Sequence, residues 1–220
     1  MTRGPGRWFD FWTGCTSPLW RFDTPDYYRL YAAELRALFP EPPPARVLEL
    51  GCGDGALFPY LGLPVSCYTG VDFSRSMLQA FSERHHGVRL VCAAAQDYSD
   101  DCRYELVFSN GLLQYLDRGM LRSHLLGATR MLAPGGRLVC GSIPWRARRW
   151  GYYFGSLADG APPRGPVQLA KAARNAVRNP IGYWYSLAEF RALAREHGLT
   201  VEFYGSLVHL YRFHAVLAAP

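Results

Sequence analysis

The 220-residue sequence has a single lysine, Lys171, no apolar stretch as long as a membrane span, and no Cys-x-x-Cys pair. A transmembrane helix needs about 20 consecutive apolar residues, so the sequence excludes an ordinary membrane-spanning helix. Residues 1–7 are followed by no long apolar core and no small-residue cleavage site, so we expect no secretory signal. The six cysteines match no zinc-ligand spacing, and we expect no metal site. A reduced, cytoplasmic protein fits this cysteine usage best.

Apolar residues make up 49% of the chain and charged residues 19%, a composition typical of one folded domain, here residues 1–220. The net charge of +6 lies in the last third, because residues 145–220 hold nine arginines and Lys171 against four acidic residues. A basic surface of this kind attracts phosphates, membrane surfaces or nucleic acid, and it is equally typical of a solvated arginine-rich face. The charge alone leaves both interpretations open.

Short apolar runs alternate with amphipathic segments through the middle of the chain. The runs that predict strands are residues 46–50, 66–71, 88–92, 104–109 and 137–143, with two more strands at 200–204 and 208–217. The segments that predict helices are residues 26–39, 57–63, 74–84, 121–132, 167–178 and 187–197. Strand–helix alternation at this spacing predicts an α/β fold with a parallel sheet and right-handed crossovers.

The composition divides the single domain into four segments. Residues 1–45 are rich in aromatic side chains and are expected to form a helical lid at the N-terminus. Residues 46–144 form the core, and residues 145–185 are a basic and aromatic cap inserted after the fifth strand. Residues 186–220 supply the last helix and the last two strands.

Glycines at alternating positions follow the first strand, at Gly51, Gly53 and Gly55. They permit a sharp turn and let a ligand approach the backbone without meeting a Cβ atom. Free N–H groups at a following helix N-terminus attract anions or polar groups of a ligand. Asp72 ends the second strand, where a carboxylate accepts both hydroxyls of a ribose. Together these residues predict an adenosine-containing cofactor at the carboxyl edge of the sheet.

The glycine spacing discriminates between cofactors. A dinucleotide-binding fold usually has Gly-x-Gly-x-x-Gly, whereas this loop is Gly-x-Gly-x-Gly with Glu49 just before it. The negative charge of Glu49 favours a cofactor with an ammonium group and disfavours a pyrophosphate. A nicotinamide-dependent reductase is further disfavoured because no Tyr-x-x-x-Lys is present: Val167 precedes the only lysine by four residues.

Four ordered segments of the core resemble the class I S-adenosylmethionine (SAM)-dependent methyltransferases, namely residues 49–55, 71–78, 104–116 and 131–139. The resemblance implies a doubly wound α/β sheet of seven strands, mostly parallel with the last strand antiparallel, and helices on both faces. It also implies that residues 46–144 bind SAM and release S-adenosylhomocysteine. Asp72 would contact the ribose, with Phe73 and Met77 against the adenine.

Two positions depart from this family pattern. Ala94 stands where the family often has an acid against the adenine amine, so we expect Gln96 and backbone groups to serve there. Residues 113–115 stand where many small-molecule methyltransferases have a histidine. The residues expected to bind the cofactor are Glu49, Gly51, Cys52, Gly53, Gly55, Asp72, Phe73, Met77, Gln96, Asn110, Gly111 and Leu112.

Methyl transfer from a sulfonium is an in-line displacement in which the protein mainly positions the nucleophile and excludes water. A hydroxyl acceptor also benefits from a general base, worth about 10²–10⁴-fold. Tyr115, after the fourth strand, and His209, expected at the start of the last strand, are the catalytic candidates, although each residue also fits a packing role. His124 lies in the middle of a helix and is expected to pack. Aromatic and arginine side chains bind apolar, cationic or anionic acceptor groups, and the expected set is Trp20, Tyr27, Tyr28, Trp145, Arg146 and Tyr185.

The sequence thus predicts methyl transfer to an oxygen or nitrogen of a small molecule, such as a natural product or a sugar. One alternative is a lipid at a membrane surface, suggested by the basic face of residues 167–178 beside Trp150, Tyr152 and Phe154. RNA is a weaker alternative, because no appended binding module and no Asn/Asp-Pro-Pro-Tyr/Phe motif is present. A non-catalytic SAM-binding subunit is disfavoured by the intact glycines and Asp72. The sequence leaves the oligomeric state open.

Overall fold

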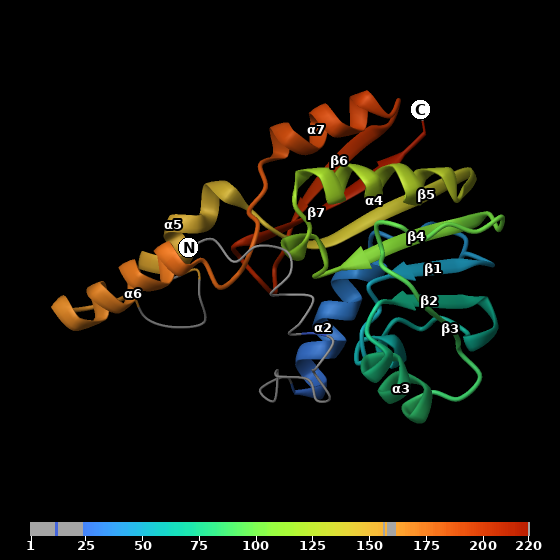
Figure 1. Cartoon of the computed structure of the whole chain (residues 1–220), viewed down its shortest axis with the longest axis horizontal. Coiled ribbons are helices and arrows are strands. Elements are labelled where there is room, and N and C mark those ends of the chain that lie inside the picture. Colours follow the sequence, from blue (N-terminus) through green and yellow to red (C-terminus); the bar gives the residue numbers. More distant parts are fainter. Residues whose placement is uncertain (1–11, 13–23, 156, 158–161, 220) are drawn as a thin grey trace.

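The computed structural model describes residue 12 and residues 24–155, 157 and 162–219 (Figure 1). It contains one seven-stranded sheet in the order β3-β2-β1-β4-β5-β7-β6. The strands are β1 (Val47–Leu50), β2 (Tyr68–Asp72), β3 (Arg89–Cys92), β4 (Tyr104–Asn110), β5 (Leu132–Pro144), β6 (Thr200–Gly205) and β7 (Arg212–Ala218). β7 runs antiparallel to both of its neighbours, β5 and β6, and all other pairs are parallel, so the predicted doubly wound, mostly parallel sheet is confirmed.

Helices cover both faces of the sheet. They are α2 (Pro25–Arg36), α3 (Arg75–Arg84), α4 (Arg118–Arg130), α5 (Arg149–Phe154), α6 (Pro166–Arg178) and α7 (Leu187–Glu196). The apolar residues of α4 and α7 share one buried cluster with one face of the sheet, and those of α2 and α3 share another cluster with the opposite face. Removing these apolar side chains from water contributes roughly 1.5–3 kcal/mol each.

Local sequence signals set several helix ends. Asp117 Oδ1 accepts a hydrogen bond from the Met120 backbone N–H at 2.9 Å and caps α4. Ser186 and Glu189 form a capping box at the start of α7. The α2 helix begins after Thr24 and ends at Arg36, three residues before the predicted end. Its buried residues pack on the sheet, and the N-terminal lid remains a prediction because residues 1–11 and 13–23 lie outside the described part of the chain.

The helix predicted over residues 57–63 is wrong. Only one 3₁₀ turn forms, η1 (Phe58–Tyr60), because the positive φ of Gly62 (67°) ends the helical conformation and the extended Pro64 follows. Phe58 nevertheless anchors this connection, since its ring lies 4.7 Å from that of Tyr68 and 5.6 Å from that of Phe81. A second 3₁₀ turn, η2 (Val65–Cys67), leads into β2.

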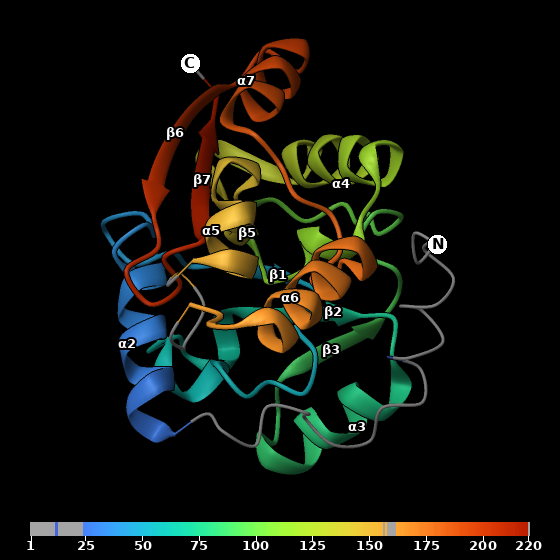
Figure 2. The same cartoon turned by 90° about the vertical axis from the view of Figure 1, so that its left-hand side faces the viewer.

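The inserted segment after β5 begins with a 3₁₀ turn, η4 (Arg146–Arg148), and continues in α5 and α6, which extend beyond the carboxyl edge of the sheet (Figures 1 and 2). A separate cluster of Tyr153, Ala176, Trp184 and Tyr211 attaches these helices to the domain. The positive φ of Asn179 (48°) ends α6, and its side-chain oxygen accepts the Trp184 Nε1–H at 2.8 Å. No helix in the described ranges is long and apolar enough to cross a bilayer.

Candidate cofactor and acceptor site

A cavity opens at the carboxyl ends of β1, β2 and β4. It is lined by Trp12, Gly51, Asp72, Phe73, Ala94, Ala95, Gln96, Leu112, Tyr115, Leu116 and Met120. Five of these residues are among those predicted from the sequence to bind the cofactor, and Tyr115 is one of the two predicted catalytic candidates; the other, His209, is not among the lining residues. The connections that follow the four parallel strands β1, β2, β3 and β4 therefore meet at one place, as the strand order requires.

The glycine loop adopts backbone conformations that other residues rarely adopt. Gly51, Gly53 and Gly55 have φ values of 82°, 57° and 71°. The loop is tied to β2, because the N–H groups of Gly51 and Cys52 both donate to the Val71 carbonyl oxygen, at 2.7 and 3.1 Å. A Cβ at Gly51 would lie 3.0 Å from Leu112 Cδ1, at the wall of the cavity. The loop therefore needs glycine for both its turn and its surface.

Asp72 joins the glycine loop to the end of β2. Its Oδ2 accepts the Gly53 N–H at 2.9 Å, and its Oδ1 accepts the Ser74 N–H at 2.9 Å. Burial raises the pKa of the carboxyl group, although the hydrogen bonds from Ser74 and Gly53 oppose this shift. The carboxylate is thus fixed at the cavity edge before any ligand arrives.

Two predicted cofactor residues have side chains buried beside the loop. Glu49 accepts a short hydrogen bond from the Tyr68 hydroxyl, and burial raises the pKa of its carboxyl group to about 8. Cys52 belongs to the apolar cluster shared with α2 and α3, and burial raises its thiol pKa well above the ordinary value. At neutral pH both groups are protonated, and neither residue is among those that line the cavity.

Phe73, Ala95 and Gln96 line the side of the cavity next to β2 and β3. The Gln96 amide nitrogen also donates to Asp97 Oδ2 at 3.1 Å. Met77 is buried on α3 with its Cε 3.6 Å from where a Gly53 Cβ would lie, so it supports the loop from behind rather than lining the cavity.

Leu112, Tyr115 and Leu116, which follow β4, supply the opposite wall, whereas the predicted Asn110 and Gly111 are not among the lining residues. Asn110 Oδ1 accepts the Tyr31 hydroxyl at 2.8 Å, and burial raises the pKa of Tyr31 to about 12. Gly111 has a φ of 64° and precedes η3 (Leu113–Tyr115). The Tyr115 ring lies edge-on to Trp12 with ring centres 5.8 Å apart, and burial raises its pKa, so Tyr115 is protonated at neutral pH.

His209 lies in the turn before β7, not at the start of a strand, because β7 begins at Arg212 and the Arg212 N–H donates to the His209 carbonyl at 2.8 Å. Its Nε2 is 2.8 Å from the Tyr27 hydroxyl, which joins two of the predicted residues. The rings of Tyr31 and Tyr211 lie 5.6 and 5.8 Å from the imidazole. His209 is thus held in a group of aromatic rings contributed by α2 and the β6–β7 turn.

Other predicted acceptor residues lie elsewhere. Tyr28 stacks on Tyr60 at 5.6 Å, and Trp145 packs against Phe213 at 6.1 Å. Tyr185 is buried and donates a short hydrogen bond to the Leu116 carbonyl, and Arg146 forms an ion pair with Glu189 at 2.8 Å. None of these four lines the cavity, and Trp20 lies outside the described residues.

His124 is packed in the core, as expected. Its Nε2 is 3.2 Å from Ser109 Oγ, and its Nδ1 is 3.3 Å from the Ala95 carbonyl oxygen. Burial lowers its pKa to about 4, so it stays neutral at physiological pH.

The sequence interpretation missed Arg212, whose guanidinium is buried beside Ser142 and Gln114. A charged residue inside the otherwise apolar stretch 208–217 was the available signal. It also missed Trp12 and Tyr31, for which only the aromatic composition of residues 1–45 gave a hint.

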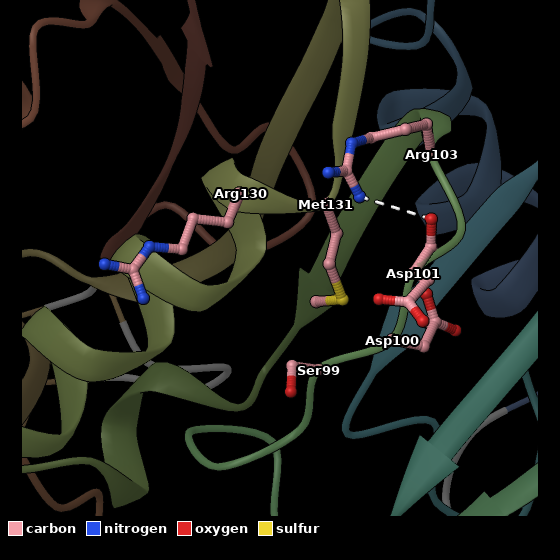
Figure 3. Close-up of a pocket in the computed structure, with 6 residues that line it drawn as sticks. All are labelled: Ser99, Asp100, Asp101, Arg103, Arg130 and Met131. Carbon is pink, nitrogen blue, oxygen red and sulfur yellow. Dashed lines mark hydrogen bonds between the residues drawn. The ribbon is translucent and has the colours of Figure 1, made fainter.

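A second hollow lies at the opposite edge of the sheet, near the starts of β4 and β5 (Figure 3). It is lined by Ser99, Asp100, Asp101, Arg103, Arg130 and Met131. Asp100 Oδ2 there accepts the hydroxyls of Tyr98 and Tyr104 at 2.6 and 2.7 Å. These bonds anchor the loop before β4, and the hollow is remote from the glycine loop.

Comparison with known proteins agrees with this arrangement. A model described as a methyltransferase domain matches residues 47–136. A trans-aconitate 2-methyltransferase of Methylobacterium nodulans is 32% identical over 173 residues, which cover 78% of this chain and 64% of that protein. The chain thus spans less than two thirds of that relative's length. Among solved structures, the DhpI-SAM-HEP complex has a TM-score of 0.66 at 18% identity, with 99% of both chains covered.

The N-methyltransferase NodS of Bradyrhizobium japonicum, in complex with S-adenosylhomocysteine, has a TM-score of 0.62 at 20% identity, with 99% of both chains covered. The fold is that of a Rossmann-like α/β domain with a glycine loop and a cavity at the carboxyl ends of its parallel strands. Residues 47–136 match a methyltransferase domain, and the chain shares the fold of solved structures of methyltransferases that hold S-adenosylmethionine or S-adenosylhomocysteine.

Proposed function

We propose that this protein transfers a methyl group from SAM to an oxygen or nitrogen of a small-molecule acceptor. The observation that carries the proposal is the position of Asp72, whose carboxylate is fixed at the cavity edge by the Gly53 and Ser74 N–H groups. A ribose bound there would lie between the glycine loop and Phe73. The adenine would lie beside Ala95 and Gln96, which line the same side of the cavity.

The residues around the cavity fit this cofactor. The surface of the loop at Gly51 leaves no room for a side chain, and the wall formed by Leu112, Leu116 and Met120 is apolar. Glu49 lies just before the loop and is protonated at neutral pH, since its pKa is about 8. A bound ammonium group would lower that pKa, because an opposite charge favours the carboxylate.

Bound SAM supplies an activated methyl group on a sulfonium. The protein's own residues then position the acceptor and accept its proton. His209 is the candidate for the base. It is not among the residues that line the cavity, and its Nε2 lies 2.8 Å from the Tyr27 hydroxyl, which would have to give way to the acceptor or relay its proton. Tyr115 has a raised pKa and stays protonated, so it would donate a hydrogen bond to the acceptor rather than remove a proton.

The decisive experiment is calorimetric titration of the purified protein with S-adenosylhomocysteine and, separately, with NADH. We expect micromolar binding of S-adenosylhomocysteine, no binding of NADH, and a loss of at least tenfold in affinity for Asp72→Ala. Asp101→Ala is the matched control, because Asp101 is exposed and lies in the remote hollow (Figure 3). Binding of NADH instead, or unchanged affinity in Asp72→Ala, would overturn the proposal.

The acceptor class is proposed from the relatives as well as the geometry. The names of these relatives include trans-aconitate 2-methyltransferase and malonyl-[acyl-carrier protein] O-methyltransferase, and both names contain an acid, aconitate or malonate. Transfer of tritium from labelled SAM to a panel of hydroxy, amino and carboxylic acids tests this. S-Adenosylhomocysteine binding without transfer to any acceptor would favour the non-catalytic subunit.

A membrane-surface acceptor is the second candidate, favoured by α6. Its exposed residues include Val167 and Val177, 81% and 76% exposed, next to Lys171, Arg174 and Arg178. Exposed apolar and basic side chains on one helix are typical of contact with anionic lipid. Sedimentation with phosphatidylglycerol vesicles tests this: binding that is lost on Val177→Asp supports it, and no binding excludes it.

A further inference from the structure

The guanidinium of Arg212 is buried without a counter-charge. The residue is 8% exposed, and its Nη1 and Nη2 donate to the Ser142 carbonyl oxygen and to Gln114 Oε1, at 2.6 and 2.8 Å. The guanidinium carbon lies 5.0 Å from the centre of the Tyr211 ring. All three of these partners are neutral. Among the described residues, no carboxylate forms an ion pair with Arg212, and its Nε–H has no hydrogen-bond partner.

Glu34, an acid close to this cluster, is already engaged. Its carboxylate accepts the Ser206 hydroxyl at 3.0 Å and the Leu207 N–H, and it lies 3.3 Å from His214 Nε2. Removing a charged group from water costs several kcal/mol unless an opposite charge compensates it. Because the buried guanidinium of Arg212 is surrounded by neutral acceptors only, the site strongly favours the binding of an anion.

Arg212 lies at the edge of the sheet where the cofactor cavity opens. It is the first residue of β7, and because β7 is antiparallel its start pairs with the end of β5, Pro144 opposite Arg212. Gln114, which accepts its Nη2–H, directly precedes Tyr115 in the cavity wall. Tyr31, which donates to Asn110, is near enough for the charge of Arg212 to oppose the rise in its pKa.

The backbone beside Arg212 is distorted in a way that presents an acceptor to it. Ser142 has a φ of 57°, and the pairing of β5 with β7 shifts register between Cys140 and Ile143. A left-handed conformation at a non-glycine residue costs roughly 1–3 kcal/mol and is concentrated at functional sites. Here the distortion directs the Ser142 carbonyl to the guanidinium while the Ser142 N–H donates to His214 Nδ1 at 3.3 Å.

We propose that Arg212 binds an anionic group of the methyl acceptor, a carboxylate or a phosphate. This inference rests on the proposed methyltransferase function and names the chemical class of its acceptor. The planar guanidinium matches both anions with directed N–H donors, and the Nε–H is one such donor. Arg212 would then determine specificity, by holding the acceptor beside Tyr115 and His209.

The test is calorimetric titration of three probes, namely benzoate, phenyl phosphate and the neutral benzamide. Each is added to the S-adenosylhomocysteine complex and to the protein alone. We expect at least one anion to bind ten or more times more tightly than benzamide. A preference for benzoate over phenyl phosphate, or the reverse, identifies the anion. Equal affinity for all three probes would overturn the proposal.

Three variants make the test specific. Arg212→Gln removes the charge, and Gln114→Glu places a carboxylate on the same Nη2–H, so each should weaken anion binding at least tenfold. Gln114→Glu should also raise the melting temperature, since it supplies the missing counter-charge, and this variant keeps the test valid if Arg212→Gln does not fold. Arg137→Gln, an exposed arginine of β5, is the control and should change nothing.

The outcomes separate the two proposals. Unchanged anion affinity in Gln114→Glu overturns the role of Arg212. A loss of S-adenosylhomocysteine affinity as large as the loss of anion affinity would assign Arg212 to the cofactor instead, which also overturns it. Failure of the wild-type protein to bind S-adenosylhomocysteine is a failure of the proposed function, and the titrations without that ligand still decide whether Arg212 binds an anion.

Discussion

Asp72 Oδ2 accepts the backbone N–H of Gly53 at 2.9 Å, so the carboxylate proposed to bind the ribose also holds the glycine loop. The residue thus has two roles that a single substitution affects together. Its Oδ1 accepts the Ser74 N–H, which fixes the rotamer of the side chain.

Asp72→Asn removes the negative charge of the side chain and keeps its size, so it tests the contribution of the charge to cofactor binding. The amide keeps one acceptor oxygen but places an NH₂ group against either the Gly53 or the Ser74 N–H. We expect the affinity for S-adenosylhomocysteine to fall about 10–100-fold, or roughly 1.4–2.7 kcal/mol, with the fold intact. Calorimetry measures the affinity and circular dichroism checks the fold; an unchanged affinity would contradict the role of Asp72.

Gly55, in the glycine loop, and Gly135, in β5, form a matched pair of substitution sites that tests how closely the loop is packed. Both have positive φ, 71° and 75°, but a Cβ at Gly55 would lie 2.5 Å from Phe81 Cδ2, whereas nothing lies within 4 Å at Gly135. We expect Gly55→Ala to destabilise by about 2–4 kcal/mol and Gly135→Ala by about 1 kcal/mol. Urea unfolding measures both, and equal losses would show that the close packing against Phe81 contributes nothing.

Glu49 should make stability depend on pH. Its pKa of about 8 in the fold exceeds the ordinary value of 4.5, so the folded state binds more protons than the unfolded state over that window. Stability should therefore fall as pH rises from 4.5 to about 8, by roughly 1.5 kcal/mol between pH 6.5 and 8.

Thermal unfolding of the wild-type protein and Glu49→Gln at these two pH values tests the prediction. Glu49→Gln should show a much flatter profile. His124, whose pKa is lowered to about 4, acts in the opposite sense below pH 6.5 and does not interfere in this range. Identical pH profiles would mean that Glu49 is ionised throughout.

Tyr27 and Tyr28 provide a matched test of the proposed base. Tyr27→Phe removes the hydroxyl that lies 2.8 Å from His209 Nε2, whereas Tyr28→Phe keeps a ring that stacks on Tyr60. For an acceptor found in the tritium assay, we expect His209→Asn to lower kcat about 10²-fold and Tyr27→Phe to lower it several-fold. Tyr28→Phe should leave kcat unchanged, and equal effects of both Phe substitutions would exclude a specific role for Tyr27.

Local residue patterns predicted most of the strands and the long helices, because buried strands are short apolar runs and amphipathic helices repeat apolar residues every three to four positions. They failed at residues 57–63, where Gly62 and the following Pro64 outweigh the apolar spacing. They also placed the start of the last strand at Val208, since apolar residues continue through a turn that only the hydrogen bond from Arg212 to His209 defines.

The sequence by itself was enough to predict the glycine loop and Asp72. Each of them directly follows or ends one predicted strand, so its residues are close together in the sequence. Only the tertiary structure decided which residues far apart in the chain come into contact. Tyr27 reaches His209 across 182 residues of chain, and Arg212 reaches Gln114 across 98. Such contacts follow from the antiparallel insertion of β7 beside β5, which no local period in the sequence encodes.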